Sequence, residues 1–359
     1  MKITGITVTV IPMPPLERPF WNSIVRTTGR GAARAEITTD EGITGMAPCG
    51  ARVKNYVEGT IAPKLIGQDP LRIEHLWNTM YMGGTRKPVA AGADIVAMSV
   101  VDNALWDLKG KALNTPVWKL AGGAQDSVWV YAAGGYYEEG KGIAELCKEM
   151  ESYVAEGFGA VKMKVGWPGA GLPHDAERVR AVRKAIGDEV ELMVDANNAW
   201  DANNAIRFGR MIEDARAYWF EEPVHADDFE GAAKVADALD VPVASGENTF
   251  TRFGFRDLIE RGATEVVQAD PNTCGGISEW LKIAAQASAG HLPMAPHGKA
   301  EIGCSCVAAV GNGLITEHYP TAFRSELTEP LTFRNGRIEM PDEPGLGIVW
   351  REDEIARRV

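Results

Sequence analysis

Hydrophobic and polar residues follow two different spacings in the first third of this 359-residue chain. Residues 1 to about 45 alternate in the manner of β-strands, as in Ile3, Ile6, Val8 and Val10. From about 54 to 122, apolar residues recur every three or four positions, for example in RIEHLWNTMY and DIVAMSVVDNALWDLKGKALN, which predicts helices. Residues 1–124 are therefore expected to form an α+β domain.

After Gly122-Gly123 the pattern changes to short apolar runs separated by helical segments. Eight runs predict strands, at 127–133, 160–165, 191–196, 217–221, 241–245, 265–269, 292–296 and 313–317. Their starts lie roughly 21 to 33 residues apart, which is the length that a strand, a helix and two loops need. The pattern favours a (β/α)₈ TIM barrel over residues 125–320 rather than a doubly wound open sheet. Residues 321–359 return to a strand-and-turn texture and are expected to rejoin the first domain.

Charge and composition narrow the class of partner. Hydrophobic residues make up 45% and charged residues 24% of the chain, as in ordinary folded domains. The formal net charge of −12 argues against a nucleic acid or an anionic membrane surface as partner and favours a small molecule. There is no apolar run long enough for a membrane span, and the five cysteines are an odd, scattered set. A cytoplasmic protein with reduced thiols is therefore expected.

Three consecutive predicted strands deliver a carboxylate near their ends. These residues are Asp195, Glu221 and Glu247, and 26 positions separate each from the next. In a barrel the strand ends meet at one rim, where three carboxylates repel one another unless a cation lies between them. Each acid taken alone could be a turn or loop residue, but the shared position favours a site for one Mg²⁺, which prefers oxygen ligands.

The second predicted strand contains two lysines, in the stretch VKMKVG. Because side chains alternate along a strand, Lys162 and Lys164 should point to the same side, opposite Val161, Met163 and Val165. Surface lysines would require a strand that faces water, which a barrel strand does not. Beside a cation–carboxylate cluster, one lysine can pair with an anionic substrate group and, with partial burial, hold the pKa of the other down toward neutrality as a base.

The sixth and seventh predicted strands end at Asp270 and His297. A carboxylate beside an imidazole fixes its tautomer and raises its basicity, which predicts a general acid/base dyad. The eighth strand ends at Glu317, which either accepts a hydrogen bond from a protonated substrate oxygen or is a plain rim residue. With Lys164 opposite His297, a base stands on each side of the predicted metal. This arrangement suits removal of a proton from the carbon next to a carboxylate.

Taken together, these motifs resemble the enolase superfamily, mandelate racemase subgroup, over essentially the full length of the chain. The resemblance rests on AMSVVDNALWDLKGKALNTPVWKLAGG (97–123), VKMKVG, VDANNAW, EEPV, SGENTF, QADPNTCGG, APHG and PGLGIVW. The muconate cycloisomerase branch typically has lysine at the end of the sixth strand, where this chain has Asp270, and is disfavoured.

The resemblance implies an α+β capping domain over the barrel, a homo-oligomer, and one Mg²⁺ bound by the three acids. It also implies a role for six other residues: Lys164 and the His297–Asp270 dyad as bases, Lys162 as partner of the substrate carboxylate, Glu317 as a hydrogen-bonding group for the enediolate, and Asn197 as a substrate contact. Members of this subgroup racemise or epimerise carboxylates or dehydrate acid sugars.

Two loops of the capping domain are expected to select the substrate, at roughly 15–31 and 47–56. Arg26, Arg52 and Lys54 in these loops favour an anionic, hydroxylated ligand, unless they face solvent. Phe20 and Trp21 either line an aromatic pocket or pack against the barrel rim. We therefore expect a Mg²⁺-dependent acid-sugar dehydratase. A racemase or epimerase of a 2-substituted carboxylate is the main alternative, and a non-catalytic ligand-binding protein on the same scaffold is a remote one.

Overall fold

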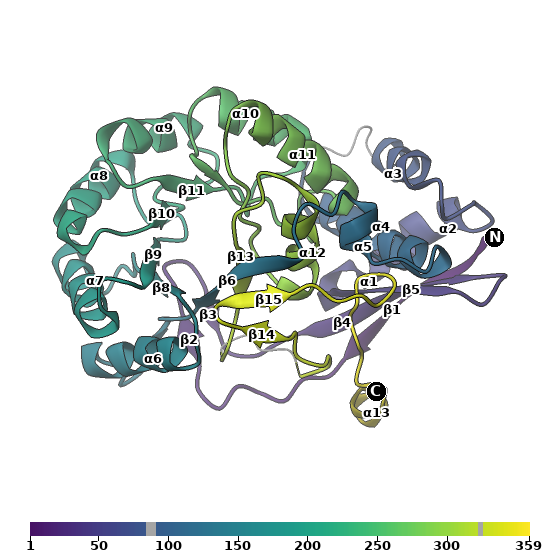
Figure 1. The fold of residues 1–359 in the computed structure, drawn as a ribbon, viewed down its shortest axis with the longest axis horizontal. Coiled ribbons are helices and arrows are strands. Elements are labelled where there is room, and N and C mark those ends of the chain that lie inside the picture. The colour runs from purple at the N-terminus through teal and green to yellow at the C-terminus, as the bar shows by residue number, and fades with distance from the viewer. Residues whose placement is uncertain (84–90, 322–325) are drawn as a thin grey trace.

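The amino-terminal alternation forms an antiparallel sheet in the computed structural model, which describes residues 1–83, 91–321 and 326–359. The sheet consists of β1 (Ile3–Ile11), β4 (Ala32–Thr39) and β5 (Thr44–Cys49), in that order. Figure 1 shows this capping domain beside the ring of barrel elements. The α+β domain and the barrel predicted from the sequence are thus both confirmed.

Helical segments of the capping domain pack on its sheet and on one another. They are the short turns η1 (Ala51–Val53), α1 (Lys54–Tyr56), η2 (Val57–Ile61) and α2 (Ala62–Leu65), then α3 (Ile73–Met82), α4 (Ala93–Ala112) and α5 (Val117–Leu120). The long helix α4 packs closely on the sheet at Gly45, where an added Cβ would lie 2.2 Å from the carbonyl oxygen of Ala104. Its other side contacts the barrel helix α11 (Ile277–Ala289). Helix α4 is therefore buried on almost every side.

Parallel strands close into a barrel around a core of buried interior side chains. They are β6 (Ser127–Ala133), β8 (Ala160–Lys164), β9 (Glu191–Asp195), β10 (Trp219–Glu221), β11 (Val243–Ser245), β12 (Val266–Val267) and β13 (Thr316–His318). Strand β13 pairs with β6, and Met294 bridges Val267 and Gly313 to complete the circle.

Several predicted strands are shorter than expected. The seventh, 292–296, is reduced to the single bridge at Met294, and the fifth begins only at Val243. Prolines explain both differences: Pro293 and Pro296 flank Met294, and Pro242 precedes β11. Proline has no backbone N–H to donate to a strand ladder, so pairing stops beside it.

Helices surround the barrel in the order expected. They are α6 (Ile143–Ala155), α7 (Leu172–Ile186), α8 (Ala202–Met211), α9 (Phe229–Ala238), α10 (Thr251–Glu260), α11 and α12 (Ala300–Ala309), with a 3₁₀ turn, η3 (Glu213–Ala215), after α8. In the part of the chain that the structure describes, β13 is followed by a hairpin rather than by an eighth barrel helix. The barrel is thus a modified form of the (β/α)₈ arrangement.

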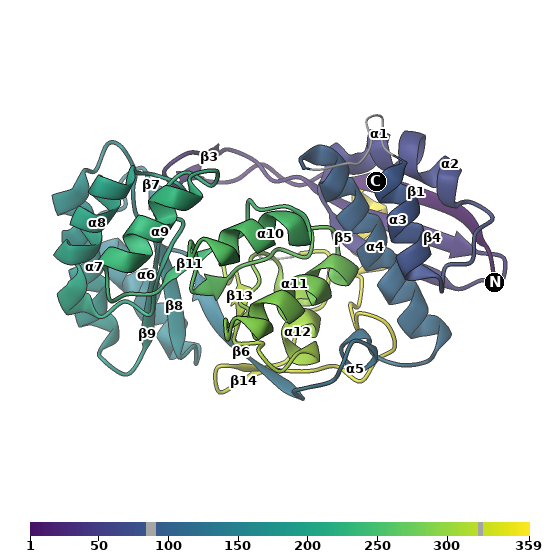
Figure 2. The same cartoon turned by 90° about the horizontal axis from the view of Figure 1, so that it is seen from above.

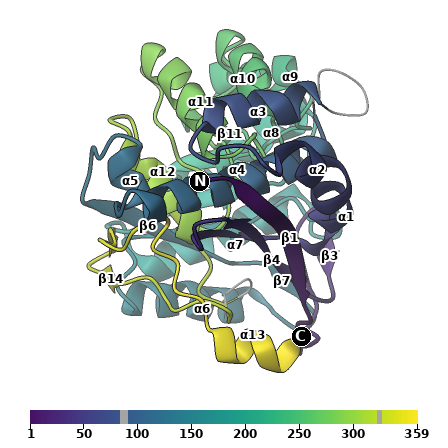
Figure 3. The ribbon, with the colours of Figure 1, turned by 90° about the vertical axis from the view of Figure 1, so that its right-hand side faces the viewer.

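The hairpin after the barrel contacts both parts of the molecule. It consists of β14 (Phe333–Arg334) and β15 (Arg337–Glu339), and β15 pairs antiparallel with β6. Gly345 then bridges to Pro116. Helix α13 (Glu352–Arg358) reaches the capping sheet, where Glu352 pairs with Arg34 at 2.5 Å, and Figure 3 shows it near the end of β1. The division at residues 124 and 320 stays a prediction.

One segment of the capping domain crosses to the barrel. Strands β2 (Phe20–Trp21) and β3 (Arg26–Thr27) form a small sheet with β7 (Tyr137–Glu138), which follows β6. Figure 2 shows the segment that contains β3 reaching over from the capping domain. The predicted loop 15–31 therefore lies next to the carboxyl-terminal end of a barrel strand.

All five cysteines are free thiols, as the sequence predicts. No helix among the described residues is both long enough and apolar enough to span a membrane.

Candidate active site

The lysine pair lies on β8 as the alternation predicts. The side chains of Lys162 and Lys164 are almost fully buried inside the barrel, with relative exposures of 1% and 3%. Val161 and Met163 point the other way, into the core between the barrel and its helices. Both faces of the strand are buried, which excludes the surface-lysine alternative.

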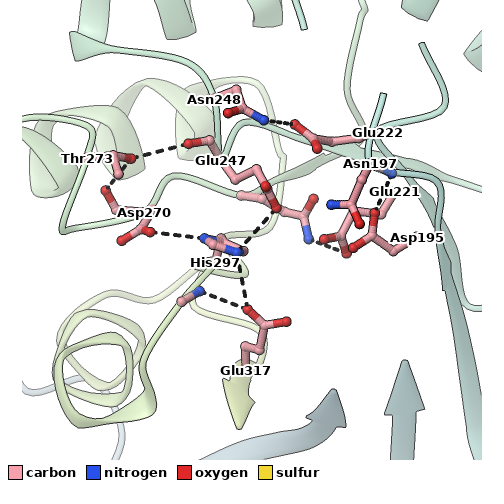
Figure 4. A network of polar contacts seen from close by, with 12 residues as sticks. Asp195, Asn197, Glu221, Glu222, Glu247, Asn248, Asp270, Thr273, His297 and Glu317 are labelled. Atoms are coloured by element: carbon pink, nitrogen blue, oxygen red, sulfur yellow. Dashed lines mark hydrogen bonds and ion pairs between the residues drawn. The ribbon is translucent and has the colours of Figure 1, made fainter. Parts of the chain in front are cut away.

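Three predicted metal ligands meet beside these lysines. Asp195 and Glu221 end β9 and β10, and Glu247 follows β11 by two positions. The strand register pairs Lys164 with Asp195, and Asp195 with Glu221. One carboxylate oxygen from each acid lies within 4.8 Å of the others, as Figure 4 illustrates. The structure thus brings together all three acids at one point of the rim.

The lysines balance part of this negative charge. The Lys162 ammonium lies 2.6 Å from Glu221 Oε1 and 3.8 Å from Asp195 Oδ2. Lys164 pairs directly with the same Asp195 oxygen. Burial, and then Asp195, raises the pKa of Glu221 to about 7, and burial raises the pKa of Glu247. The acids therefore remain crowded even with two ammonium groups present.

The donor set fits a hard divalent cation. Its three carboxylates lie at or just after the ends of three neighbouring barrel strands, and Glu247 Oε2 is buried without a hydrogen bond, with His297 Nε2 as an ion-pair partner at 3.4 Å. A buried carboxylate oxygen that lacks a donor is unfavourable, and a cation at this position would satisfy it. Oxygen ligands of this kind suit Mg²⁺.

The pKa of Lys164 is shifted in the direction opposite to the one expected beside a bound cation. Burial lowers the pKa of Lys164, but Asp195 and then Tyr136 raise it, and the net shift is upward rather than toward neutrality. The Lys164 ammonium also lies 5.2 Å from the centre of the Tyr136 ring, which stabilises the cation further. Alternation places Lys164 directly against a carboxylate and not only beside Lys162, and a lowered pKa with a cation between the acids stays a prediction.

Asp270 and His297 form the predicted pair. The two side chains are 3.0 Å apart, from Asp270 Oδ2 to His297 Nδ1. The other ring nitrogen, Nε2, faces Glu247 at 3.4 Å and Glu317 at 3.7 Å. Burial lowers the pKa of His297, but Glu247, Glu317 and Asp270 together raise it well above its ordinary value. The neighbouring carboxylates therefore favour the cationic form of the imidazole, and Nε2 faces Glu247 and Glu317.

Glu317 lies inside the barrel and not at a solvated rim. Its carboxylate is fully buried, and Oε1 lies 2.8 Å from the Lys162 ammonium. Oε2 accepts hydrogen bonds from the backbone N–H of Gly298 and from the hydroxyl of Tyr319, both at 2.8 Å. Burial alone would raise the pKa of Glu317. The nearby Lys162 ammonium, followed by His297, outweighs burial and lowers this pKa to about 2.

Two neutral donors to Glu221 were missed in the sequence. Trp219 Nε1 and Gln268 Nε2 both donate to Glu221 Oε2, at 2.9 and 2.8 Å. The two-residue alternation that identified Lys162 also places Trp219 on the same face of β10 as Glu221. The signal was present, but apolar strand residues were treated only as core.

Asn197 contacts the capping loop. Asn22 Nδ2 donates to Asn197 Oδ1 at 3.0 Å, and Ser23 Oγ donates to the Asn197 carbonyl at 2.7 Å. Asn197 also donates its backbone N–H to Asp195 Oδ1, and its φ of 42° lies in the left-handed region that asparagine tolerates. Asn22 and Ser23 were missed because an irregular loop has no periodicity to indicate which residues point inward.

The three predicted capping-loop residues lie on β2, β3 and η1. The Trp21 ring packs against Trp167, with ring centres 5.5 Å apart, and Arg26 is exposed above the Trp21 ring. Arg52 lies in η1 and is exposed. Their roles in substrate binding stay predictions.

Known protein families match both the capping domain and the barrel of this chain. The amino-terminal domain of mandelate racemase / muconate lactonizing enzymes matches residues 5–122, and the enolase C-terminal domain-like family matches residues 145–354. The chain belongs to the mandelate racemase / muconate lactonizing enzyme family. The enolase-superfamily membership suggested by the sequence motifs is thus confirmed.

Relatives of this family member include sugar-acid enzymes. An arabinonate dehydratase from Saccharolobus solfataricus is 35% identical and covers 88% of this chain and 87% of its own length. A 3,6-anhydro-alpha-L-galactonate cycloisomerase from Streptomyces coelicolor is 33% identical, covering 89% of each chain. The crystal structure of a racemase from Streptomyces coelicolor A3(2) with bound magnesium superposes with a TM-score of 0.92, at 31% identity, over 99% of both chains.

Proposed function

We propose that this family member is a Mg²⁺-dependent dehydratase that converts an acid sugar, an aldonate or aldarate, to a 2-keto-3-deoxy acid. The observation that carries the proposal is the placement of two proton-transfer groups beside different ligands of one carboxylate cluster. Lys164 pairs with Asp195, whereas His297 Nε2 faces Glu247. A substrate bound at the cluster can thus lose a proton on one side and gain one on the other.

Asp195, Glu221 and Glu247 would hold the cation, one per subunit. Bound Mg²⁺ would supply positive charge that stabilises the enediolate form of a substrate carboxylate, and the same charge would lower the pKa of Lys164. The relatives support this choice of metal, since the racemase structure from Streptomyces coelicolor contains magnesium.

The residues divide the reaction between them. Neutral Lys164 takes the proton from the α-carbon, and the Lys162 ammonium pairs with the substrate carboxylate. The His297 imidazolium gives its proton to the hydroxyl on the neighbouring carbon, so that the C–O bond breaks and water leaves. Asp270 holds His297 at Nδ1 with Nε2 toward the substrate. The enol product then becomes the 2-keto acid.

Polar groups of the capping loop support an acid-sugar substrate. Asn22 and Ser23 lie against Asn197, so hydroxyl-binding groups stand next to the cluster. Arg26 and Arg52 would attract an anionic ligand from the outer part of the loops. The arabinonate dehydratase relative acts on a substrate of this class by its name.

Screening a library of aldonic and aldaric acids for 2-keto product tests the proposal. We expect Mg²⁺-dependent product with at least one acid. Exchange of the α-proton or inversion of configuration without any keto product would overturn dehydration.

A racemase or epimerase is the second candidate, because groups on both sides of the substrate also suit inversion at the α-carbon. Polarimetry and deuterium uptake at that carbon would detect it. A homo-oligomer in the cytoplasm stays a prediction, and light scattering measures the assembly.

A further inference from the structure

The eighth strand repeats the pattern of the second. Glu317 and Tyr319 stand two positions apart at the end of β13, so they share a face as Lys162 and Lys164 do on β8. The Tyr319 ring packs against the aromatic and small side chains that fill the barrel interior, among them Tyr131. A phenol therefore reaches the site from the same strand as Glu317.

The hydroxyl of Tyr319 touches two groups of the site. It donates to Glu317 Oε2 at 2.8 Å and lies 3.5 Å from His297 Nε2. Gly298 N–H donates to the same carboxylate oxygen, and Lys162 holds the other one at 2.8 Å. Glu317 is therefore held from three directions, by an ammonium group, a backbone amide and the Tyr319 hydroxyl.

We propose that Tyr319 is a positioning residue that acts through Glu317. Glu317 Oε2 and His297 Nε2 are 3.7 Å apart, beyond a hydrogen bond. With the Tyr319 hydroxyl in place, Glu317 stays at this separation and leaves His297 Nε2 directed at the substrate. Without the hydroxyl, the carboxylate turns toward the imidazole ring and forms a direct hydrogen bond with Nε2. This inference rests on the proposed function, because that function assigns the proton donor role to His297.

Tyr319→Phe removes the hydroxyl and keeps the ring, so packing in the barrel is preserved. Tyr218→Phe is the matched control. Tyr218 packs against the same interior cluster but precedes β10, at the end of the strand opposite Glu221. Both variants should keep the melting temperature of the wild type to within about 3 °C, since neither removes ring contacts.

A double-mutant cycle with Glu317→Gln separates positioning from an independent role. We expect Tyr319→Phe to lower kcat by about tenfold and to change KM by less than about threefold, as loss of a bond to a charged group allows. In the E317Q background it should lower kcat by less than about twofold. Equal losses in both backgrounds, or no loss in the single variant, would overturn the proposal. Tyr218→Phe should leave kcat unchanged.

A crystal structure of the Tyr319→Phe protein tests the inference without any substrate. The distance from Glu317 Oε2 to His297 Nε2 should fall to hydrogen-bond length, about 3 Å. A carboxylate that keeps its wild-type position would contradict the inference, even if an acid sugar were turned over. Failure of every acid sugar in the wild type would instead contradict the proposed function and leave this structural result standing.

Discussion

Two buried acidic sites in this molecule are built on opposite principles. At the junction of the domains, Asp102 on α4 is fully buried and accepts hydrogen bonds from Ser278, at 2.8 Å from the backbone N–H and 2.7 Å from the hydroxyl. Trp106 Nε1 donates to the same hydroxyl, and Asn103 accepts from the N–H of Ile277. Helix α4 thus caps the amino terminus of α11 with neutral donors.

The barrel rim instead pairs its acids with cations and with one another. Asp195 and Glu221 share two ammonium groups, and Glu247 keeps a buried oxygen without a hydrogen-bond donor. Burial alone therefore does not distinguish the two sites. What distinguishes them is the partner: a carboxylate fully satisfied by a helix end joins two domains, whereas crowded carboxylates suit a cation and a substrate.

The largest expected effect falls on the proton-transfer groups of the rim. Lys164→Ala and His297→Asn should each lower kcat by about 1,000-fold or more, because general acid–base groups contribute on the order of 10² to 10⁴ in rate. Circular dichroism should show an intact fold in both variants. Wild-type-like activity in either variant would contradict the assignment of that residue.

The next effect concerns the metal. Glu247→Gln should weaken Mg²⁺ binding by about 100-fold in calorimetry, since it removes one anionic ligand of three. Glu343→Gln is the matched control, because Glu343 is exposed on the carboxyl-terminal segment. Equal Mg²⁺ affinity in the two variants would remove Glu247 from the ligand set.

At the junction, the expected effect is on stability and depends on pH. Burial raises the pKa of Asp102 to about 7, although the hydrogen bonds from Ser278 oppose the shift, and Glu279 and Lys282 on α11 contribute smaller effects of opposite sign. The pKa of an aspartate in the unfolded chain is about 3.9. Because the pKa of Asp102 is higher in the folded protein, the protonated side chain stabilises the fold. This stabilisation is fully present below about pH 4 and is lost as the pH rises through about 7.

Urea unfolding at pH 5 and pH 8 measures this contribution against Asp102→Asn, which does not titrate. The free energy of unfolding of the wild type should fall by about 2.5 kcal/mol more than that of D102N between the two pH values. Parallel losses in the two proteins would mean that Asp102 is ionised throughout this range.

The smallest expected effect is at the capping loop. Asn22→Ala removes the hydrogen bond to Asn197 and should lower kcat/KM by about tenfold, mainly through KM, as one lost polar contact allows. Ile24→Ala is the control, since Ile24 is 62% exposed on the same loop. If both changes have the same small effect, the contact with Asn197 does not position the loop.

The sequence predicted those features that follow from simple periodicity. A repeat of 3.6 residues predicted helices α3 and α4. A repeat of two residues predicted the shared face of Lys162 and Lys164 and the strand-end positions of Asp195 and Glu221. These features needed no knowledge of tertiary contacts beyond closure of the barrel.

Features that depend on a second segment could not be predicted in this way. The Asn22 contact joins residues 175 positions apart, and the upward shift in the pKa of Lys164 depends on Asp195 of the neighbouring strand. Prolines could have indicated the reduced seventh strand, since Pro293 and Pro296 flank it. The cap of α4 on α11 required the docking of the two domains.

The antiparallel pairing of β15 with β6 has a consequence for biosynthesis. The ribosome completes β6 roughly 200 residues before it reaches β15, yet the first half of β6 finds its antiparallel neighbour only there. Until then a nascent chain carries an open strand edge, the kind of surface that promotes aggregation. A chain that stops before residue 337 is therefore expected to need chaperones or to be degraded, even though every residue of the metal cluster has been made.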